Sequence, residues 1–146
     1  MKLTIVRTDK KRYLPLLLEA DEEEKQIDTY LERGTLYVAT EDETVIGVAV
    51  ITKEKEGYEL QNMAIAPTCR RQGKGSALLN RLCTLYAGEK MYVGTGDSGS
   101  TVPFYEACGF RYDHTIPHFF TERYEEKIVE NGVILDDMIV LVKECS

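Results

Sequence analysis

The residues with the clearest chemical character lie in one turn, Arg70–Ser76, which reads RRQGKGS. The turn follows an apolar extended run that ends at Pro67, and it precedes a run with helical spacing. The first N–H groups of a helix lack partners within the helix, and the helix dipole makes that end positive. Glycines let a ligand approach the backbone closely, and the basic side chains add charge. We therefore expect this turn to bind the phosphates of a nucleotide-like cofactor. The residues assigned to the site are Arg70, Arg71, Gln72, Gly73, Lys74, Gly75 and Ser76.

Two other interpretations account for the turn less well. A solvated basic turn at a helix start would explain a bare Gly-x-Gly, but the preceding strand, Pro67 and the long amphipathic helix favour a cofactor site. A P-loop requires G-x-x-x-x-G-K-[ST], whereas this turn reads Gly-Lys-Gly-Ser without the first glycine. The spacing therefore excludes a P-loop.

A second glycine run, Gly94–Gly99, formally matches G-x-G-x-x-G. In a dinucleotide-binding fold this pattern opens a long βαβ unit, with an acidic residue about 20 positions later. Here only a short helix containing Pro103 is expected to follow. A loop ahead of that helix, with Ser100 or Thr101 as the helix cap, is the simpler interpretation.

The elements that must position these residues follow from periodicity and from turn residues. Polar turns between the strands of residues 35–66 indicate antiparallel hairpins. The alternation of strands and helices predicts an α/β or α+β fold with a mixed sheet. Strands are expected at residues 2–7, 35–40, 44–53, 58–66 and 90–95, from 110 onward, and at 133–143; helical segments are expected at 12–33, 73–87 and 101–108.

Size and composition fit one folded domain, residues 1–146, of which 43% are hydrophobic and 29% charged. The net charge of −7 argues against nucleic acid and anionic membranes as partners, because both attract clustered basic residues. The acidic segments Asp21–Glu24 and Glu122–Glu126 favour a cationic partner. No apolar run approaches the roughly 20 residues that span a bilayer, and the first residues do not read as a signal peptide. A cytoplasmic location is expected.

The four cysteines lie far apart in the sequence, without a C-x-x-C pair. We expect reduced thiols and no metal site, because His114 and His118 lie near only one cysteine. A catalytic cysteine is not indicated, since no histidine lies in a recognisable activating context.

Two motifs and their separation resemble the GNAT superfamily of acetyl-CoA-dependent N-acetyltransferases. The turn, read as Arg70-x-x-Gly73-x-Gly75, is similar to the family's [Q/R]-x-x-G-x-[G/A] pyrophosphate loop. The segment Phe104–Phe110, FYEACGF, is similar to the F-Y-x-x-x-G-F signature near the second cofactor-contacting helix. One helix and one strand lie between the motifs, as in the family.

This resemblance implies a mixed, mostly antiparallel central sheet of about six to seven strands flanked by about four helices. It also implies transfer of an acetyl group from acetyl-CoA to a primary amine by direct attack in a ternary complex. The acceptor is a small molecule or a peptide, and a homodimer is compatible with the fold. The alternative is a non-catalytic acyl-CoA-binding or sensor domain on the same fold.

The resemblance also implies roles in binding the cofactor and in protonating its sulfur. Backbone groups of Met63, Ala64 and Ile65 match the splayed strand that pairs with the pantetheine arm and polarises the acetyl carbonyl. Tyr105 matches the tyrosine that acts as general acid near the sulfur, although a purely aromatic core role is the alternative. Asp97 occupies the loop where the family often has an asparagine contacting pantetheine, and it lacks the amide donor.

Glu59 lies where some family members carry a general base that acts directly or through water. Burial would raise its pKa for this purpose, whereas a solvated glutamate paired with a lysine is an equally simple interpretation. Gln61 shares the face of Glu59 under a two-residue period and could hold the water or amine. His114 and His118 are further candidates for the base, although His118 beside two phenylalanines also fits an aromatic packing cluster.

Overall fold

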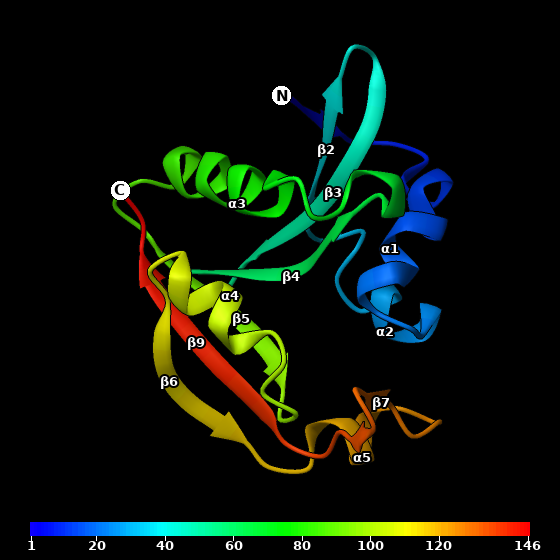
Figure 1. Cartoon of the computed structure of the whole chain (residues 1–146), viewed down its shortest axis with the longest axis vertical. Coiled ribbons are helices and arrows are strands. Elements are labelled where there is room, and N and C mark those ends of the chain that lie inside the picture. Colours follow the sequence, from blue (N-terminus) through cyan, green and yellow to red (C-terminus); the bar gives the residue numbers. More distant parts are fainter.

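A seven-stranded mixed sheet forms the centre of the structure, a computed structural model that describes residues 1–146 (Figure 1). The strand order is β1-β2-β3-β4-β5-β9-β6, and β4 and β5 are the parallel pair. The predicted mixed, mostly antiparallel sheet is therefore confirmed. The strands are β1 (Lys2–Val6), β2 (Thr35–Glu41), β3 (Thr44–Lys53), β4 (Tyr58–Ile65), β5 (Lys90–Gly96), β6 (Arg111–Ile116) and β9 (Met138–Glu144), with a separate pair of β7 (Val129–Glu130) and β8 (Val133–Ile134).

Helices cover both faces of this sheet. Alternate residues of β2 belong to different hydrophobic clusters: Leu36 packs with α1 and α2 residues, whereas Tyr37 packs with α3 residues. The first cluster includes Leu17 and Ile27, and the second includes Leu78 and Leu82. The helices are α1 (Leu14–Ala20), α2 (Glu24–Asp28), α3 (Lys74–Leu85), α4 (Val102–Ala107) and α5 (Phe119–Arg123), with 3₁₀ segments at Lys10–Tyr13 and Pro67–Cys69. None of these helices has the length and apolar character needed to cross a membrane.

Two of the expected elements are interrupted in the structure. Residues 12–33 are not continuously helical, because Asp21 is extended and its carboxylate accepts hydrogen bonds from two tyrosines. The expected strand at 133–143 is divided into β8 and β9. Between these strands the backbone N–H groups of Asp136 and Asp137 donate to the side chain of Asp97 instead of joining a strand ladder.

A bulge in β4 changes which side chains face each side of the sheet. Ile51 pairs with Leu60 and Val50 pairs with Asn62, so Gln61 is an extra residue on β4. Leu60 consequently belongs to the cluster of α3, whereas Ala64 belongs to the cluster of α1 and α2. Without the bulge both residues would lie on the same face.

Strands β4 and β5 pair only at their first residues. The parallel register joins Tyr58, Glu59 and Leu60 to Met91, Tyr92 and Val93, and no pair follows. Beyond these pairs the two strands diverge, as Figure 1 shows. The edge of β4 from residue 61 to residue 65 therefore has no strand partner on this side. The carbonyl of Ile65 accepts a hydrogen bond from the Arg70 side chain, and backbone groups that face away from β3 can pair with a ligand.

Candidate active site

A cavity of about 650 Å³ lies where β4 and β5 separate. Its walls come from both strands, from α4 and from the C-terminal segment. The predicted residues among its lining are Met63, Ala64, Ile65, Arg70, Gly75 and Tyr105. The structure thus brings the unpaired edge of β4, part of the basic turn and the second motif to one opening.

The backbone of the turn offers a group of unpaired donors. The N–H groups of residues 71–76 make no hydrogen bond to other backbone atoms, and the first bond onto the turn runs from Ala77 to the carbonyl of Gly73. Arg71 and Gly73 both have positive φ angles, of 64° and 73°. A Cβ added at Gly73 would meet no atom within 4 Å, so the space beside this residue is open. This exposed set of donors at the start of α3 fits a pyrophosphate group.

The basic side chains of the turn are mostly engaged elsewhere. The ammonium of Lys74 lies 2.7 Å from the carboxylate of Glu41, and the guanidinium of Arg70 lies 3.6 Å from Glu19. Arg71 has no such partner. The turn therefore offers its N–H groups more directly than its side-chain charges.

Tyr105 lies on α4 with its ring against Phe104 and Phe110. Its hydroxyl has no hydrogen-bond partner in the protein, and the residue lines the larger cavity. Burial raises the pKa of Tyr105 to about 12. The tyrosine therefore keeps its proton at neutral pH and can donate it to a group in the cavity.

A smaller cavity of about 320 Å³ lies at the other end of the opening and holds Glu59. Gln61, Leu60 and Gly94 line both cavities, so the two spaces are adjacent. Burial raises the pKa of Glu59 above its ordinary value, and the nearby Glu54 adds to the rise. The carboxylate of Glu59 makes no hydrogen bond or ion pair, so the alternative interpretation, a glutamate paired with a lysine, is not seen. Gln61 lines the smaller cavity with Glu59, and its amide donates to the hydroxyl of Thr52.

A polar network that the sequence did not reveal borders both cavities. Asp21, from the corner between α1 and α2, accepts hydrogen bonds of 2.8 Å from the hydroxyls of Tyr30 and Tyr124. Tyr30 in turn accepts a bond of 3.1 Å from the buried amide of Asn62 on β4. Burial raises the pKa of Asp21 although both tyrosines oppose the rise. The network fixes the C-terminal segment against the first helices beside the opening.

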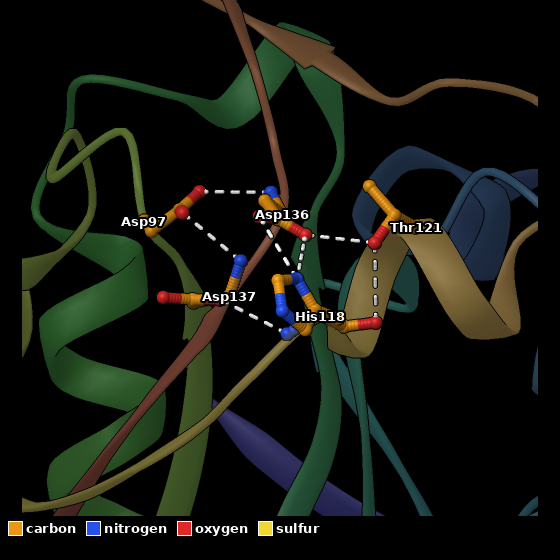
Figure 2. Close-up of polar contacts among 5 residues, drawn as sticks. All are labelled: Asp97, His118, Thr121, Asp136 and Asp137. Atoms are coloured by element: carbon orange, nitrogen blue, oxygen red, sulfur yellow. Dashed lines mark hydrogen bonds and ion pairs between the residues drawn. The ribbon is translucent and has the colours of Figure 1, made fainter.

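Asp97 points toward the backbone of the C-terminal segment (Figure 2). Its two carboxylate oxygens accept the N–H groups of Asp136 and Asp137 at 3.1 and 2.9 Å. Asp136 also accepts hydrogen bonds from Thr121 and His118, which lie at the start of α5. The structure therefore shows Asp97 as part of a connection between β5, β9 and α5, and not as a free side chain in the cavity.

The two histidines lie on the outer side of this region. The ring of His118 bonds to Asp136, and this pair raises the pKa of His118. His114 lines the smaller cavity, and its Nδ1 atom bonds to Asp113 at 2.7 Å. His118, Asp136 and Asp137 place ligand-type atoms within 4.8 Å of one another, but these groups already bond to one another or to neighbouring backbone.

The second glycine run has a packing role. Gly94 and Gly96 lie within β5, and a Cβ at these positions would overlap the side chains of Met138 and Leu135 respectively. The short α4 follows, as expected. Thr101, one of the two expected caps, occupies the N-cap position but makes no side-chain bond to the helix. The hydroxyl of Ser100 bonds to Glu130 instead.

Comparison with known proteins agrees with this geometry. The Acetyltransferase (GNAT) domain family matches residues 32–112. The uncharacterized N-acetyltransferase YvbK of Bacillus subtilis is 34% identical, and the match covers 86% of this chain and 84% of that protein.

Solved structures show the same architecture over nearly the whole chain. A GNAT acetyltransferase from Elizabethkingia anophelis with acetyl-CoA bound has a TM-score of 0.89 and 32% identity, covering 98% of this chain and 97% of the other. A Bacillus subtilis acetyltransferase in complex with CoA has a TM-score of 0.86 and 30% identity, covering 99% of both. The chain belongs to the GNAT family and is an acetyl-CoA-dependent N-acetyltransferase.

Proposed function

We propose that the protein transfers the acetyl group of acetyl-CoA to a primary amine of a small molecule or peptide by direct attack in a ternary complex. The observation that carries this proposal is the continuous opening between β4 and β5. Tyr105 lines its larger cavity, and Glu59 lines the adjacent smaller one. A donor and an acceptor can therefore meet at the edge of β4 between an acid and a base.

The larger cavity and the turn would hold the donor. The N–H groups of residues 71–76 would bind the pyrophosphate, and the unpaired edge at residues 63–65 would bind the pantetheine arm. We assign Asp97 a positioning role, because its carboxylate already accepts two backbone N–H groups. When bound, acetyl-CoA supplies an acetyl carbon that exchanges its bond to sulfur for a bond to the amine nitrogen.

The protein's own groups would move the protons. Glu59 accepts a proton from the amine, directly or through a water held by Gln61. Tyr105 donates its proton to the departing sulfur. Backbone N–H groups of the β4 edge stabilise the negative charge that develops on the acetyl oxygen. The two hydrophobic clusters share one sheet, which supports assigning residues 1–146 to a single acetyltransferase domain.

The cysteines give no support to a covalent acetyl-enzyme. Cys83 and Cys145 are buried, and none of the four cysteines lines either cavity. Initial rates measured at varied acetyl-CoA and amine concentrations should give intersecting double-reciprocal lines. Parallel lines, or an acetylated protein after incubation with acetyl-CoA alone, would contradict direct attack.

A further inference from the structure

Two charged side chains of the smaller cavity have neither a hydrogen bond nor an ion pair within the protein. Both oxygens of Asp21 accept tyrosine hydroxyls, and Glu54 pairs with Arg33 at 3.0 Å. The carboxylate of Glu59 and the guanidinium of Arg123 have no such partners. Both residues line this cavity.

Arg123 is held in place by an aromatic ring instead of an acid. Its guanidinium lies 4.4 Å from the centre of the Phe119 ring, and its backbone carbonyl accepts a hydrogen bond from Gln26. Stacking on a ring leaves the edge donors of a guanidinium available. The positive charge of Arg123 is near enough to Glu59 to lower the pKa of that carboxyl against the effect of burial.

We propose that the acceptor is an amino carboxylate, with its amine directed to Glu59 and its carboxylate bound by Arg123. This inference rests on the function proposed above, because it assigns the acceptor to the cavity of Glu59. A guanidinium binds a carboxylate through two parallel hydrogen bonds, which gives both strength and orientation. A diamine would instead place its second cation beside the guanidinium of Arg123, which repels it.

The inferred class differs from the cationic acceptor that the net charge of −7 favours. Much of that negative charge lies outside the cavity or is already paired within it. Glu122 and Glu125 are exposed, and Glu125 pairs with Lys25 at 2.7 Å. The local pair of unsatisfied charges therefore indicates the acceptor better than the overall charge does. The cavity volume of about 320 Å³ fits a small molecule or the end of a larger one.

Acceptors of equal length that differ only in the group opposite the amine distinguish amino carboxylates from other amines. The test measures CoA thiol release with alkylamines, ω-amino carboxylates and α,ω-diamines of two to six carbons, compared at equal length. We expect kcat/KM to be at least about tenfold higher for amino carboxylates, because one good charge-assisted contact has about this effect. The Arg123→Gln variant should lose this preference, and Arg123→Glu should prefer diamines.

Arg12→Glu is the matched control, because Arg12 is also exposed and lies 5.1 Å from the centre of the Tyr13 ring, outside both cavities. It should keep the preference of the native protein. Turnover of alkylamines or diamines without a preference for amino carboxylates would overturn this inference alone. An unchanged preference in Arg123→Glu would also overturn it. Absence of thiol release with every amine would overturn the proposed function, and this inference with it.

Discussion

The carboxylate of Asp97 at the end of β5 accepts the backbone N–H of Asp137, just before β9, at a distance of 2.9 Å. Its other oxygen accepts the N–H of Asp136. This pair of bonds holds the loop that carries Leu135 and Met138 against the glycines of β5. The same loop contacts the start of α5, whose residues line both cavities. Asp97 thus stabilises the segment that forms one wall of the site, without facing the cavity itself.

Asp97→Asn should lower the stability of the protein and leave cofactor binding nearly unchanged. The amide can accept one of the two N–H groups, but its own NH₂ faces the other donor. We expect the free energy of unfolding to fall by about 1–3 kcal/mol, with little change in the KM for acetyl-CoA. Denaturant unfolding and initial rates measure the two effects. Asp42→Asn, in an exposed hairpin turn, is the control and should change neither. A tenfold higher KM without loss of stability would instead indicate contact between Asp97 and the cofactor.

Gly73→Asp should abolish acetyl-CoA binding, because it adds a negative charge beside the unpaired N–H groups of the turn. The positive φ of 73° also adds a backbone strain of about 1–2 kcal/mol. Gly88→Asp is a matched control, since Gly88 has a φ of 90° and equally open surroundings beyond the other end of α3. Both variants should lose similar stability, but only Gly73→Asp should lose binding by calorimetry. Equal binding by the two variants would refute the phosphate site.

Tyr105→Phe should lower kcat by about 100-fold or more, which is the usual effect of losing a general acid. The ring contacts with Phe104 and Phe110 stay, so the fold and the affinity for CoA should change little. Rapid-mixing measurement of thiol release tests the chemical step directly. Tyr112→Phe, on an exposed residue of β6, is the control. Unchanged thiol release in Tyr105→Phe would remove the hydroxyl from the mechanism.

The contact between His118 and Asp136 should make stability depend on pH. The hydrogen bond to Asp136 raises the pKa of His118, so this contribution is complete below about 6.5 and is lost as pH rises through the folded-state pKa. Thr121 and His118 lower the pKa of Asp136, so its contribution is present above about 3.8 and is lost in more acidic solution. The difference in Tm between native protein and His118→Gln should therefore be greatest between these limits. A difference that grows above pH 8 would contradict this assignment.

Local patterns in the sequence were enough to predict most elements of the fold. The β3 strand at residues 44–53 was predicted with its observed bounds, because apolar residues and polar turns mark it on both sides. The five-residue α5 was missed, since FFTER has too few residues to show a helical period. The bulge at Gln61 was also missed, because it is defined by pairing with β3 and not by the composition of β4.

The candidate site was predicted only where motifs are local. The turn at residues 70–76 and the segment around Tyr105 have recognisable spacing, and both border the larger cavity. The contact of Asp21 with Tyr124 joins residues 103 positions apart, and no sequence pattern connects them. Glu59 and Arg123 are also far apart in the sequence, and only the folded chain brings them into one cavity.

Glu59→Gln should change both the pH dependence of catalysis and stability. Burial raises the pKa of Glu59 above its ordinary value of 4.5, so kcat/KM should fall as pH falls through that raised pKa. Dividing each rate by the neutral fraction of the amine removes the titration of the acceptor itself. In Glu59→Gln the remaining activity should be at least about 100-fold lower and should lack this acid limb. Rate profiles between pH 5 and 9 with one acceptor provide the measurement.

The same raised pKa gives a prediction that does not depend on activity. A carboxyl that binds its proton more tightly in the folded state stabilises the protein below its unfolded pKa, and this contribution is lost as pH rises through the folded pKa. Glu59 is half-buried and its carboxylate has no hydrogen-bond or ion-pair partner, so Glu59→Gln should have the higher Tm at a pH above the folded-state pKa. Glu56→Gln, in the exposed turn before β4, should change neither the rate profile nor Tm. A lower Tm in Glu59→Gln at such a pH would show that the protein stabilises the charged carboxylate, and the assignment of Glu59 as a base with a raised pKa would fail.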